Sequence, residues 1–396
     1  MITERDIPGI ISLDDHVVEP PGLWQDRLPA RYRDVGPRIE YLPTGSVRVE
    51  NDRYIEHPGT DGRLVAWWHY EDHYYSVKRY IAAAGVPPEE ADMHPITYDD
   101  MRPGCWQPAA RLADMDVNGV EASMCFPNYP RFCGQLFLEA EDRELGRLCV
   151  RAYNDWMVEE WCGDSGGRLI PLCLVPLWDA DLAAEEVRRN AARGVRAVAF
   201  SELPPWLGLP SIHSGYWDPF LGACDETGTV VSMHVGSGTK TMRTSADAPE
   251  ALSVVMIFTN TAGSMLDFLM SGVLGRFPNL RVFYAECQIG WIPYVLDRAD
   301  DVWRTHLWSH KDAAPELPST YYRDRVFSCF FKDTVGVDLL DRIGVDQVTF
   351  ETDYPHQDGT WPHSRKVAAE LLGHLEPAVV EKVLRGNASR VLGLAG

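Results

Sequence analysis

The chain has 396 residues, of which 45% are hydrophobic and 24% are charged, and this composition excludes a disordered or collagen-like protein. The formal net charge is -21, so nucleic acids and anionic membrane surfaces would be repelled. The length is compatible with two or three domains or with one large α/β barrel.

Cysteine usage and the N-terminus bear on the compartment. The nine cysteines are scattered and form no C-x-x-C pair, which indicates reduced packing residues. The first ten residues, MITERDIPGI, contain no apolar core of signal-peptide length, and no apolar run of about 18 residues stands out further along. We therefore expect a cytoplasmic protein that does not enter a membrane.

Short apolar runs bounded by breaking residues alternate with stretches of helical periodicity. The expected strands are residues 9–13, 120–126, 170–175, 196–200, 229–235, 281–286, 325–331 and 347–353. Helices are expected over residues 138–161, 179–193, 251–274, 291–304 and 362–372, with closing helices over 376–394. This alternation predicts a parallel (β/α)8 TIM barrel. An open doubly wound sheet has the same periodicity, but no G-x-G-x-x-G follows any of the strands.

Residues 20–105 do not follow the alternation. We interpret them as an insertion after the first strand that caps the barrel mouth, so that residues 1–396 form a single barrel domain with this cap. A surface excursion or an arm for homo-oligomer formation is the alternative. The segment contains an aromatic cluster that either lines a substrate cavity or packs the insertion: Trp67, Trp68, Tyr70, Tyr74 and Tyr75.

Potential metal ligands stand at the carboxyl ends of several expected strands, where barrel enzymes place their catalytic groups. The predicted ligands are Asp14, His16, Glu19, His234, Glu286, Asp353 and His356. Asp14 and His16 are two residues apart, so they share one face of an extended strand. Each residue alone could be a cap, a core histidine or a rim ion pair, but their coincidence at strands 1, 5, 6 and 8 favours a metal site. Imidazoles and carboxylates suit Zn, Mn or Fe.

Several motifs resemble those of the amidohydrolase-related family, the branch of the amidohydrolase superfamily with aminocarboxymuconate-semialdehyde decarboxylase-like proteins. They are residues 11–20 (ISLDDHVVEP), 111–116 (RLADMD), 277–280 (FPNL), 290–293 (GWIP), 352–356 (TDYPH) and 386–388 (GNA). The resemblance implies a metal-dependent (β/α)8 barrel with ligands at strands 1, 5 and 8. On this chain those positions are Asp14, His16, His234 and Asp353.

Two positions depart from that family pattern. Decarboxylase and hydrolase members usually open with His-x-His or Glu-x-His, whereas this chain has Asp14-x-His16 followed by Glu19. Where members commonly have a His-Gly-Gly after strand 6, this chain has Glu286-Cys287-Gln288. The surplus of carboxylates favours a dinuclear site. The Asp-x-His-x-x-Glu opening is also similar to that of a small group of TIM-barrel nonheme diiron monooxygenases, which includes a hydroxylase of platensimycin-type diterpenoid biosynthesis.

The first functional hypothesis is therefore a nonheme diiron monooxygenase of secondary metabolism. Two Fe ions would activate O2, with an external electron donor, to hydroxylate a bulky apolar acid, an acyl-CoA or a terpenoid. Its catalytic groups would be Glu286, His356 and Glu202, the last at the end of strand 4. The alternative is a hydrolase or decarboxylase with one Zn or Mn ion, in which His356 or Glu286 handles protons. A scaffold protein that keeps only the fold is the third reading.

Overall fold

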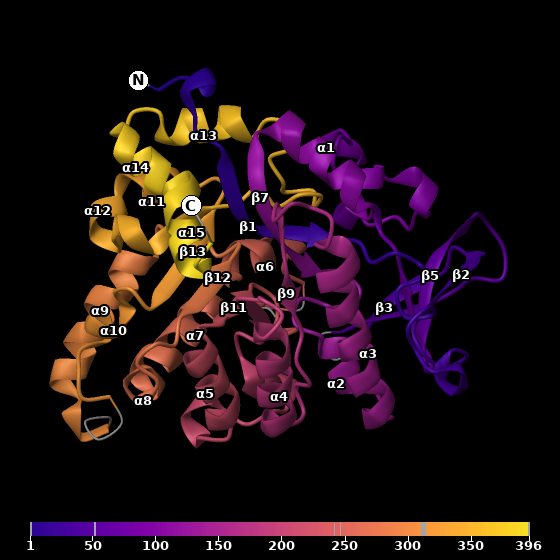
Figure 1. The fold of residues 1–396 in the computed structure, drawn as a ribbon, viewed down its shortest axis with the longest axis horizontal. Helices are drawn as coiled ribbons and strands as arrows, with labels where there is room; N and C mark the ends of the chain where they lie inside the picture. The colour runs from indigo at the N-terminus through magenta and orange to yellow at the C-terminus, as the bar shows by residue number, and fades with distance from the viewer. Residues whose placement is uncertain (1, 51–52, 241, 246, 310–313, 395–396) are drawn as a thin grey trace.

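Parallel strands lie at the centre of the molecule, with helices around them (Figure 1). The computed structural model describes residues 2–50, 53–240, 242–245, 247–309 and 314–394. The barrel strands are β1 (Ile10–Val17), β7 (Val120–Pro127), β8 (Leu169–Ile170), β9 (Leu172–Cys173), β10 (Ala197–Phe200), β11 (Val230–His234), β12 (Val282–Ala285), β13 (Val326–Phe330) and β14 (Val348–Phe350). Because β8 and β9 are the two halves of one predicted strand interrupted at Pro171, the (β/α)8 prediction is confirmed.

Backbone pairing closes the ring. Parallel pairs run in the order β1-β7-β8 and β9-β10-β11-β12-β13-β14. The amide of His16 donates to the carbonyl of Tyr354 at 2.6 Å, and the amide of Asp353 donates to the carbonyl of Asp14 at 3.0 Å. These bonds join β1 to the segment that follows β14, so residues from both ends of the chain meet at one barrel mouth.

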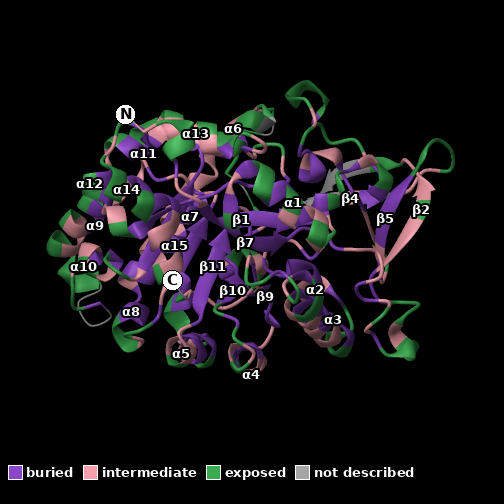
Figure 2. Ribbon diagram, turned by 45° about the horizontal axis from the view of Figure 1, so that its top comes forward, coloured by how far each residue is buried: buried purple, intermediate pink, exposed green. Residues whose placement is uncertain are grey.

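Burial on both faces explains why the barrel strands have continuous apolar runs. Every residue of β1, β11, β12 and β13 is buried, because side chains point either into the barrel or against the surrounding helices. Figure 2 shows buried strands at the centre and helices whose outer sides are exposed. Polar residues within such strands, as in β1, are therefore costly to bury and point to a specific role.

Most of the predicted helices are shorter in the structure, whereas α9 (Ile292–Thr305) has the predicted length. Their bounds are α1 Pro108–Asn118, α2 Gln135–Glu139, α3 Arg143–Trp156, α4 Ala180–Ala191, α5 Asp218–Thr227, α6 Glu250–Met256, α7 Phe258–Met270, α8 Val273–Arg276, α9 Ile292–Thr305, α10 Pro318–Tyr322, α11 Thr334–Asp338, α12 Leu340–Ile343, α13 Ser364–Leu372, α14 Pro377–Glu381 and α15 Asn387–Leu392. Aspartate side chains cap the N-termini of two helices. Asp142 accepts hydrogen bonds from two backbone amides of α3, and Asp179 accepts them from two backbone amides of α4. The predicted helix over 251–274 is broken into three.

The helix predicted over 251–274 contains an apolar stretch of a length that was not expected anywhere in the chain. Ala251–Met270, which comprises most of α6 and all of α7, is long and apolar enough by length and composition to cross a membrane. Part of it is buried inside the structure, and the core helix of a soluble protein passes the same test.

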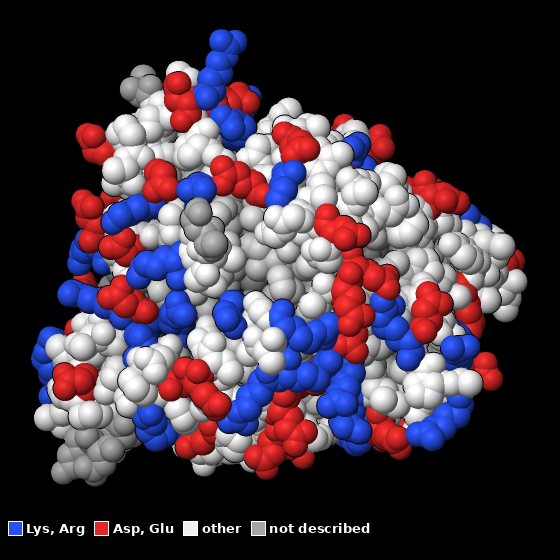
Figure 3. Space-filling view, in the orientation of Figure 1, with Lys and Arg blue, Asp and Glu red and all other residues white. Residues whose placement is uncertain are grey.

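Charged residues of both signs are interspersed over the face of the molecule in Figure 3.

Residues 20–105 contain more regular structure than the sequence indicated. Five strands form an antiparallel sheet in the order β2-β5-β6-β4-β3, which lies beside the barrel at the right of Figure 1. They are β2 (Arg38–Pro43), β3 (Ser46–Glu50), β4 (Arg53–His57), β5 (Leu64–Tyr70) and β6 (His73–Ser76). Trp68 of β5 stacks on Tyr129, which follows β7, with 4.5 Å between ring centroids. Trp67, Trp68 and Tyr70 are buried packing residues, whereas Tyr75 lines a cavity.

A buried ion pair joins two strands of this sheet to the segment that follows them. The ammonium of Lys78 contacts the carboxylate of Glu56, and the two side chains are only 3% and 1% exposed. Glu56 also accepts the amide of Ser76 at 3.0 Å, while the Lys78 ammonium lies 4.0 Å from the ring centre of Tyr75. The pair therefore orients Tyr75.

We expect Lys78→Met to lower the free energy of unfolding by about 3–5 kcal/mol, because it leaves the Glu56 carboxylate buried without a countercharge. Urea denaturation followed by circular dichroism measures this. Lys366→Met is the matched control, because Lys366 forms an exposed pair with Glu370 and its loss should cost less than about 1 kcal/mol. Equal effects of the two substitutions would contradict a stabilising role of the buried Lys78–Glu56 ion pair.

Candidate metal centre

Six of the predicted ligands meet at the carboxyl ends of the barrel strands. Asp14 and His16 belong to β1, and His234 is the last residue of β11. Glu286 directly follows β12, and Asp353 and His356 lie in the segment after β14. We call these six residues the histidine–carboxylate cluster. Parallel strands bring them together because their carboxyl ends share one mouth.

The donor atoms of this cluster lie within metal-binding range of one another. Nε2 of His16 is 3.7 Å from Oδ1 of Asp14 and 3.3 Å from Oδ1 of Asp353. Nε2 of His234 is 3.6 Å from Oδ2 of Asp14 and 3.3 Å from Oε2 of Glu286. Nδ1 of His356 is 3.2 Å from Oδ1 of Asp353. The groups Asp14–His16–His234 and His16–Asp353–His356 each place three donor atoms within 4.8 Å of one another.

The buried carboxylates of this cluster lack hydrogen-bond donors. Both carboxylate oxygens of Asp14 and of Asp353 are buried without a hydrogen-bond partner among the described residues. Nδ1 of His234 lies 2.6 Å from the carbonyl of Val235, which can only accept, so this nitrogen carries the proton and Nε2 presents a lone pair. A cation is the group that satisfies lone pairs facing one another in a buried site.

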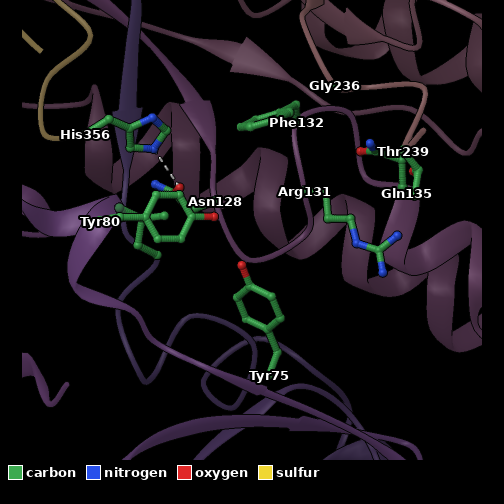
Figure 4. A pocket seen from close by; sticks show the side chains of 10 residues that line it. Tyr75, Tyr80, Asn128, Arg131, Phe132, Gln135, Gly236, Thr239 and His356 are labelled. Carbon is green, nitrogen blue, oxygen red and sulfur yellow. Dashed lines mark hydrogen bonds between the residues drawn. The ribbon is translucent and has the colours of Figure 1, made fainter. Parts of the chain in front are cut away.

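Asn128, which follows β7, orients the imidazole of His356 (Figure 4). Its Nδ2 donates to the carbonyl of Val17 at 3.0 Å, so its Oδ1 faces Nε2 of His356 at 2.9 Å. Because Oδ1 accepts, Nε2 of His356 is protonated and Nδ1 presents a lone pair toward Asp353. This is the arrangement in which an outer amide aligns a metal-binding imidazole.

Burial and mutual contacts control protonation in the cluster. Burial lowers the pKa of His234 to about 4 and lowers that of His16 well below its usual value. Burial acts to raise the pKa of Asp353, but the neighbouring His356 and His16 lower it overall. Burial, aided by nearby carboxylates, raises the pKa of Asp14 and Glu286 well above the usual value. His16 and His234 are thus neutral, which is the form that binds metals.

Unusual backbone conformations occur where the strands end. Glu286, Gln288 and Asp353 have φ angles of 55°, 52° and 50°, in the left-handed region that non-glycine residues rarely adopt. Each such residue costs on the order of 1–3 kcal/mol, and such strain concentrates at functional sites. In this protein the left-handed backbone directs the side chains of Glu286 and Asp353 into the mouth of the barrel.

Glu19 does not join the cluster. Its carboxylate oxygens accept the backbone amides of Asn128 and Tyr129, each at 2.9 Å. Burial raises its pKa to about 7. Glu19 therefore holds the loop that carries Asn128, and its oxygens are already used in this way.

Glu202 is also placed outside the cluster. Its Oε1 accepts the amide of Gly236 at 2.9 Å, and its Oε2 accepts the hydroxyl of Thr261 at 3.2 Å. The carboxylate thus fixes the loop that follows β11, just beyond His234. Burial raises its pKa to about 7.

Two acidic groups of the mouth were missed in the sequence. Glu351 and Cys329 form a third group of donors with Asp14, all buried. Glu351 is two residues before Asp353, so the same alternation that paired Asp14 with His16 could have identified it. Cys329 has no comparable signal, because thiols are ordinary packing residues in strands.

A cavity of about 230 Å³ opens beside the cluster (Figure 4). Its lining includes Tyr75, Tyr80, Asn128, Arg131, Phe132 and His356. The side chains of His356 and Glu286 are 10% and 21% exposed, whereas those of Asp14, His16, His234 and Asp353 are at most 1% exposed. The cluster therefore has a buried part and two members that reach solvent.

We expect Asn128→Leu to weaken Mn²⁺ binding by about 10- to 100-fold, because His356 loses the acceptor that fixes its tautomer. Isothermal titration with Mn²⁺ measures the affinity. Gln135→Leu is the control, since Gln135 lines the same cavity but bonds to the carbonyl of Ser237 rather than to a histidine. Unchanged affinity in Asn128→Leu would remove the residue from the site.

The raised pKa of Glu202 predicts a pH dependence of stability. Because the folded-state pKa of about 7 lies above the usual value of 4.5, the protonated carboxyl stabilises the fold below about pH 4.5, and this contribution is lost as pH rises through 7. Glu202→Gln removes the dependence. Between pH 5 and pH 8, the unfolding free energy of the wild type should fall by about 2 kcal/mol relative to that of Glu202→Gln. Urea denaturation with a chelator present tests this, and a constant difference would contradict it.

Comparisons with known proteins place this geometry in context. A gamma-resorcylate decarboxylase from Rhizobium sp. (strain MTP-10005) is 25% identical over 313 residues, covering 72% of this chain and 87% of the relative. The crystal structure of an amidohydrolase from Mycobacterium avium subsp. paratuberculosis K-10 aligns with a TM-score of 0.69 at 22% identity, covering 98% of this chain and 99% of that one. A dihydroxybenzoic acid decarboxylase from Polaromonas sp. JS666, solved with manganese and the inhibitor 2-nitroresorcinol, aligns with a TM-score of 0.62 at 15% identity and 98% coverage of both chains.

These relatives correct the functional prediction. They include decarboxylases, so the diiron monooxygenase hypothesis, with its oxidoreductase chemistry, was wrong and the alternative is the better match. Manganese in the Polaromonas structure gives no support for two Fe ions. Nor do ligands such as 2-nitroresorcinol support a CoA-linked substrate or an external electron donor.

The family assignment rests on a broader match. The sequence model of the amidohydrolase family matches residues 66–394, which include all the barrel strands except β1. Together with the donor cluster at the barrel mouth, this confirms the resemblance to the family, though not to its diiron branch. The chain belongs to the amidohydrolase family.

Proposed function

We propose that this protein is a metal-dependent decarboxylase of a small aromatic carboxylic acid. The observation that carries the proposal is a buried set of unpaired metal donors beside an aromatic-lined cavity. The gamma-resorcylate decarboxylases, which match along most of their length, support the same reaction class.

One divalent ion such as Mn²⁺ suits the four most buried donors, which are Asp14, His16, His234 and Asp353, with Nδ1 of His356 as a further donor beside Asp353. Mixed imidazole and carboxylate donors fit Mn²⁺ or Zn²⁺, and the unpaired oxygens of Asp14 and Asp353 provide the charge that such an ion needs. When bound, the ion supplies a positive charge that holds the substrate's oxygen atoms and polarises them.

The cavity fits a flat molecule with one ring. Its volume of about 230 Å³ is below the range for drug-sized ligands. Phe132 stacks on the imidazole of His234 with 4.0 Å between ring centroids, so one cavity wall is flat and apolar. The phenols of Tyr75 and Tyr80 and the guanidinium of Arg131 provide hydrogen-bond donors for hydroxyl or carboxylate oxygens. Arg131 is held in place by a bidentate pair with Glu139, at 2.8 and 3.1 Å.

Decarboxylation requires one proton. The bond between the ring carbon and the carboxylate breaks, its electron pair stays on the ring carbon, that carbon gains a proton, and CO2 leaves. Glu286 and His356 are the cluster members that reach solvent, so they are placed to deliver and exchange this proton. Glu286 stands where the family resemblance led us to expect a histidine.

The reaction is tested by incubating the Mn²⁺-loaded protein with 2,6-dihydroxybenzoate, 5-carboxyvanillate and benzoate. We expect loss of at least one substituted acid, with release of CO2 and, in D2O, one deuterium on the ring carbon that carried the carboxylate. A chelator should abolish turnover. If none of the acids is consumed, or consumption proceeds unchanged with the chelator, the proposal is overturned.

Glu286→Gln should lower kcat by about 100- to 10,000-fold, because the amide cannot donate an acidic proton. Steady-state kinetics measure this on protein whose manganese content has been determined, so that loss of metal is distinguished from loss of the proton donor. Glu202→Gln is the matched control, because that carboxylate is buried in the adjacent loop and does not reach the cavity. Retention of kcat in Glu286→Gln would exclude Glu286 as the proton donor.

A further inference from the structure

A second group of potential ligands lies next to the histidine–carboxylate cluster. It consists of Asp14 from β1, Cys329 from β13 and Glu351, which directly follows β14. All three are fully buried, and their donor atoms lie within 4.8 Å of one another. We call this group the thiol–carboxylate cluster. It shares only Asp14 with the cluster described above.

The hydrogen bonds of this cluster leave oxygens unused. Oε2 of Glu351 accepts the backbone amide of Glu286 at 3.0 Å and contacts the thiol of Cys329. Among the residues that the structure describes, Oε1 of Glu351 is buried without a hydrogen-bond partner, as are both oxygens of Asp14. Such buried, unpartnered oxygens are rare in proteins because each loses its hydration without compensation.

The charge of the barrel mouth supports the same conclusion. Four carboxylates meet there, from Asp14, Glu286, Glu351 and Asp353, and none of them forms an ion pair with a lysine or arginine in the described part of the chain. One divalent ion would neutralise two of these charges. The remaining two require either protons or another cation.

We propose that the thiol–carboxylate cluster binds a second divalent cation through the sulfur of Cys329, Oε1 of Glu351 and an oxygen of Asp14. Asp14 would then lie between the two ions. Coordination removes the thiol proton, which passes to solvent, so that a thiolate becomes the ligand. A sulfur donor with two carboxylates suits a borderline ion such as Zn²⁺ or Co²⁺ better than Mg²⁺ or Ca²⁺.

A neighbouring cysteine provides the matched control. The thiol of Cys287 is also buried, but it donates to the carbonyl of Gln288 at 3.1 Å and belongs to neither cluster. Cys287→Ser therefore removes a thiol near the mouth without removing a proposed ligand.

The test is to load chelator-stripped protein with Co²⁺, count the bound ions by mass spectrometry and record the ultraviolet spectrum. We expect two Co²⁺ ions per chain and a thiolate-to-cobalt charge-transfer band, which nitrogen and oxygen donors do not produce. Cys329→Ser should lose the band and the second ion, whereas Cys287→Ser should keep both. A single ion per chain, two ions without the band, or a band that persists in Cys329→Ser would overturn the proposal.

A second variant covers a failure of Cys329→Ser to fold. Glu351→Gln keeps the thiol and should weaken binding of the second Co²⁺ at least about tenfold, while the first ion stays bound. Unchanged affinity for both ions would count against the site. Metal counting uses no substrate, so this result and the decarboxylation assay succeed or fail separately.

Discussion

Lone pairs that face one another in a buried mouth are the constraint on which this structure depends. Asp14, His16, His234 and Asp353 are almost completely buried, and the oxygens of the two carboxylates have no hydrogen-bond partners in the part of the chain that the structure describes. Left alone, such groups would repel one another or capture protons. The surrounding residues prevent rearrangement. Asp15, between the two donors of β1, accepts the hydroxyl of Thr352 at 2.6 Å and the amide of Tyr354 at 3.0 Å, and so ties β1 to the segment with Asp353.

Arg111 of α1 completes this support from outside the mouth. Its guanidinium donates to the carbonyl of Gly104 at 2.8 Å and to that of His16, and it lies 4.3 Å from the ring centre of Tyr354. Among the described residues, it forms no hydrogen bond or ion pair with the side chain of any of the four buried donors. A fixed cation behind β1 therefore holds the backbone of His16 and the ring of Tyr354, while the charges in the mouth remain available to an ion.

Much of the barrel could be predicted from the sequence, because buried parallel strands have continuous apolar runs and their carboxyl ends must meet. Asp14, His16, His234, Glu286, Asp353 and His356 follow from that rule. Residues 20–105 could not be predicted in the same way, since their sheet is built by tertiary contacts such as Trp68 on Tyr129. Glu19 and Glu202 have the same chemistry as the ligands, yet backbone amides and a hydroxyl occupy their oxygens. Sequence position alone does not reveal such partners.

The carboxylate in place of a histidine after β12 alters the balance of the whole mouth. A neutral imidazole at this position would add no acidic group, whereas Glu286 adds a carboxyl whose pKa is raised well above the usual value by burial and by the nearby Asp353 and Glu351. The left-handed backbone of Glu286 is held by Glu351, whose carboxylate accepts the backbone amide of Glu286. Glu351 therefore positions Glu286. Each added carboxylate must be matched by a proton or by a cation. Family membership thus specifies where the donors stand, but these two glutamates determine how many positive charges this mouth must hold.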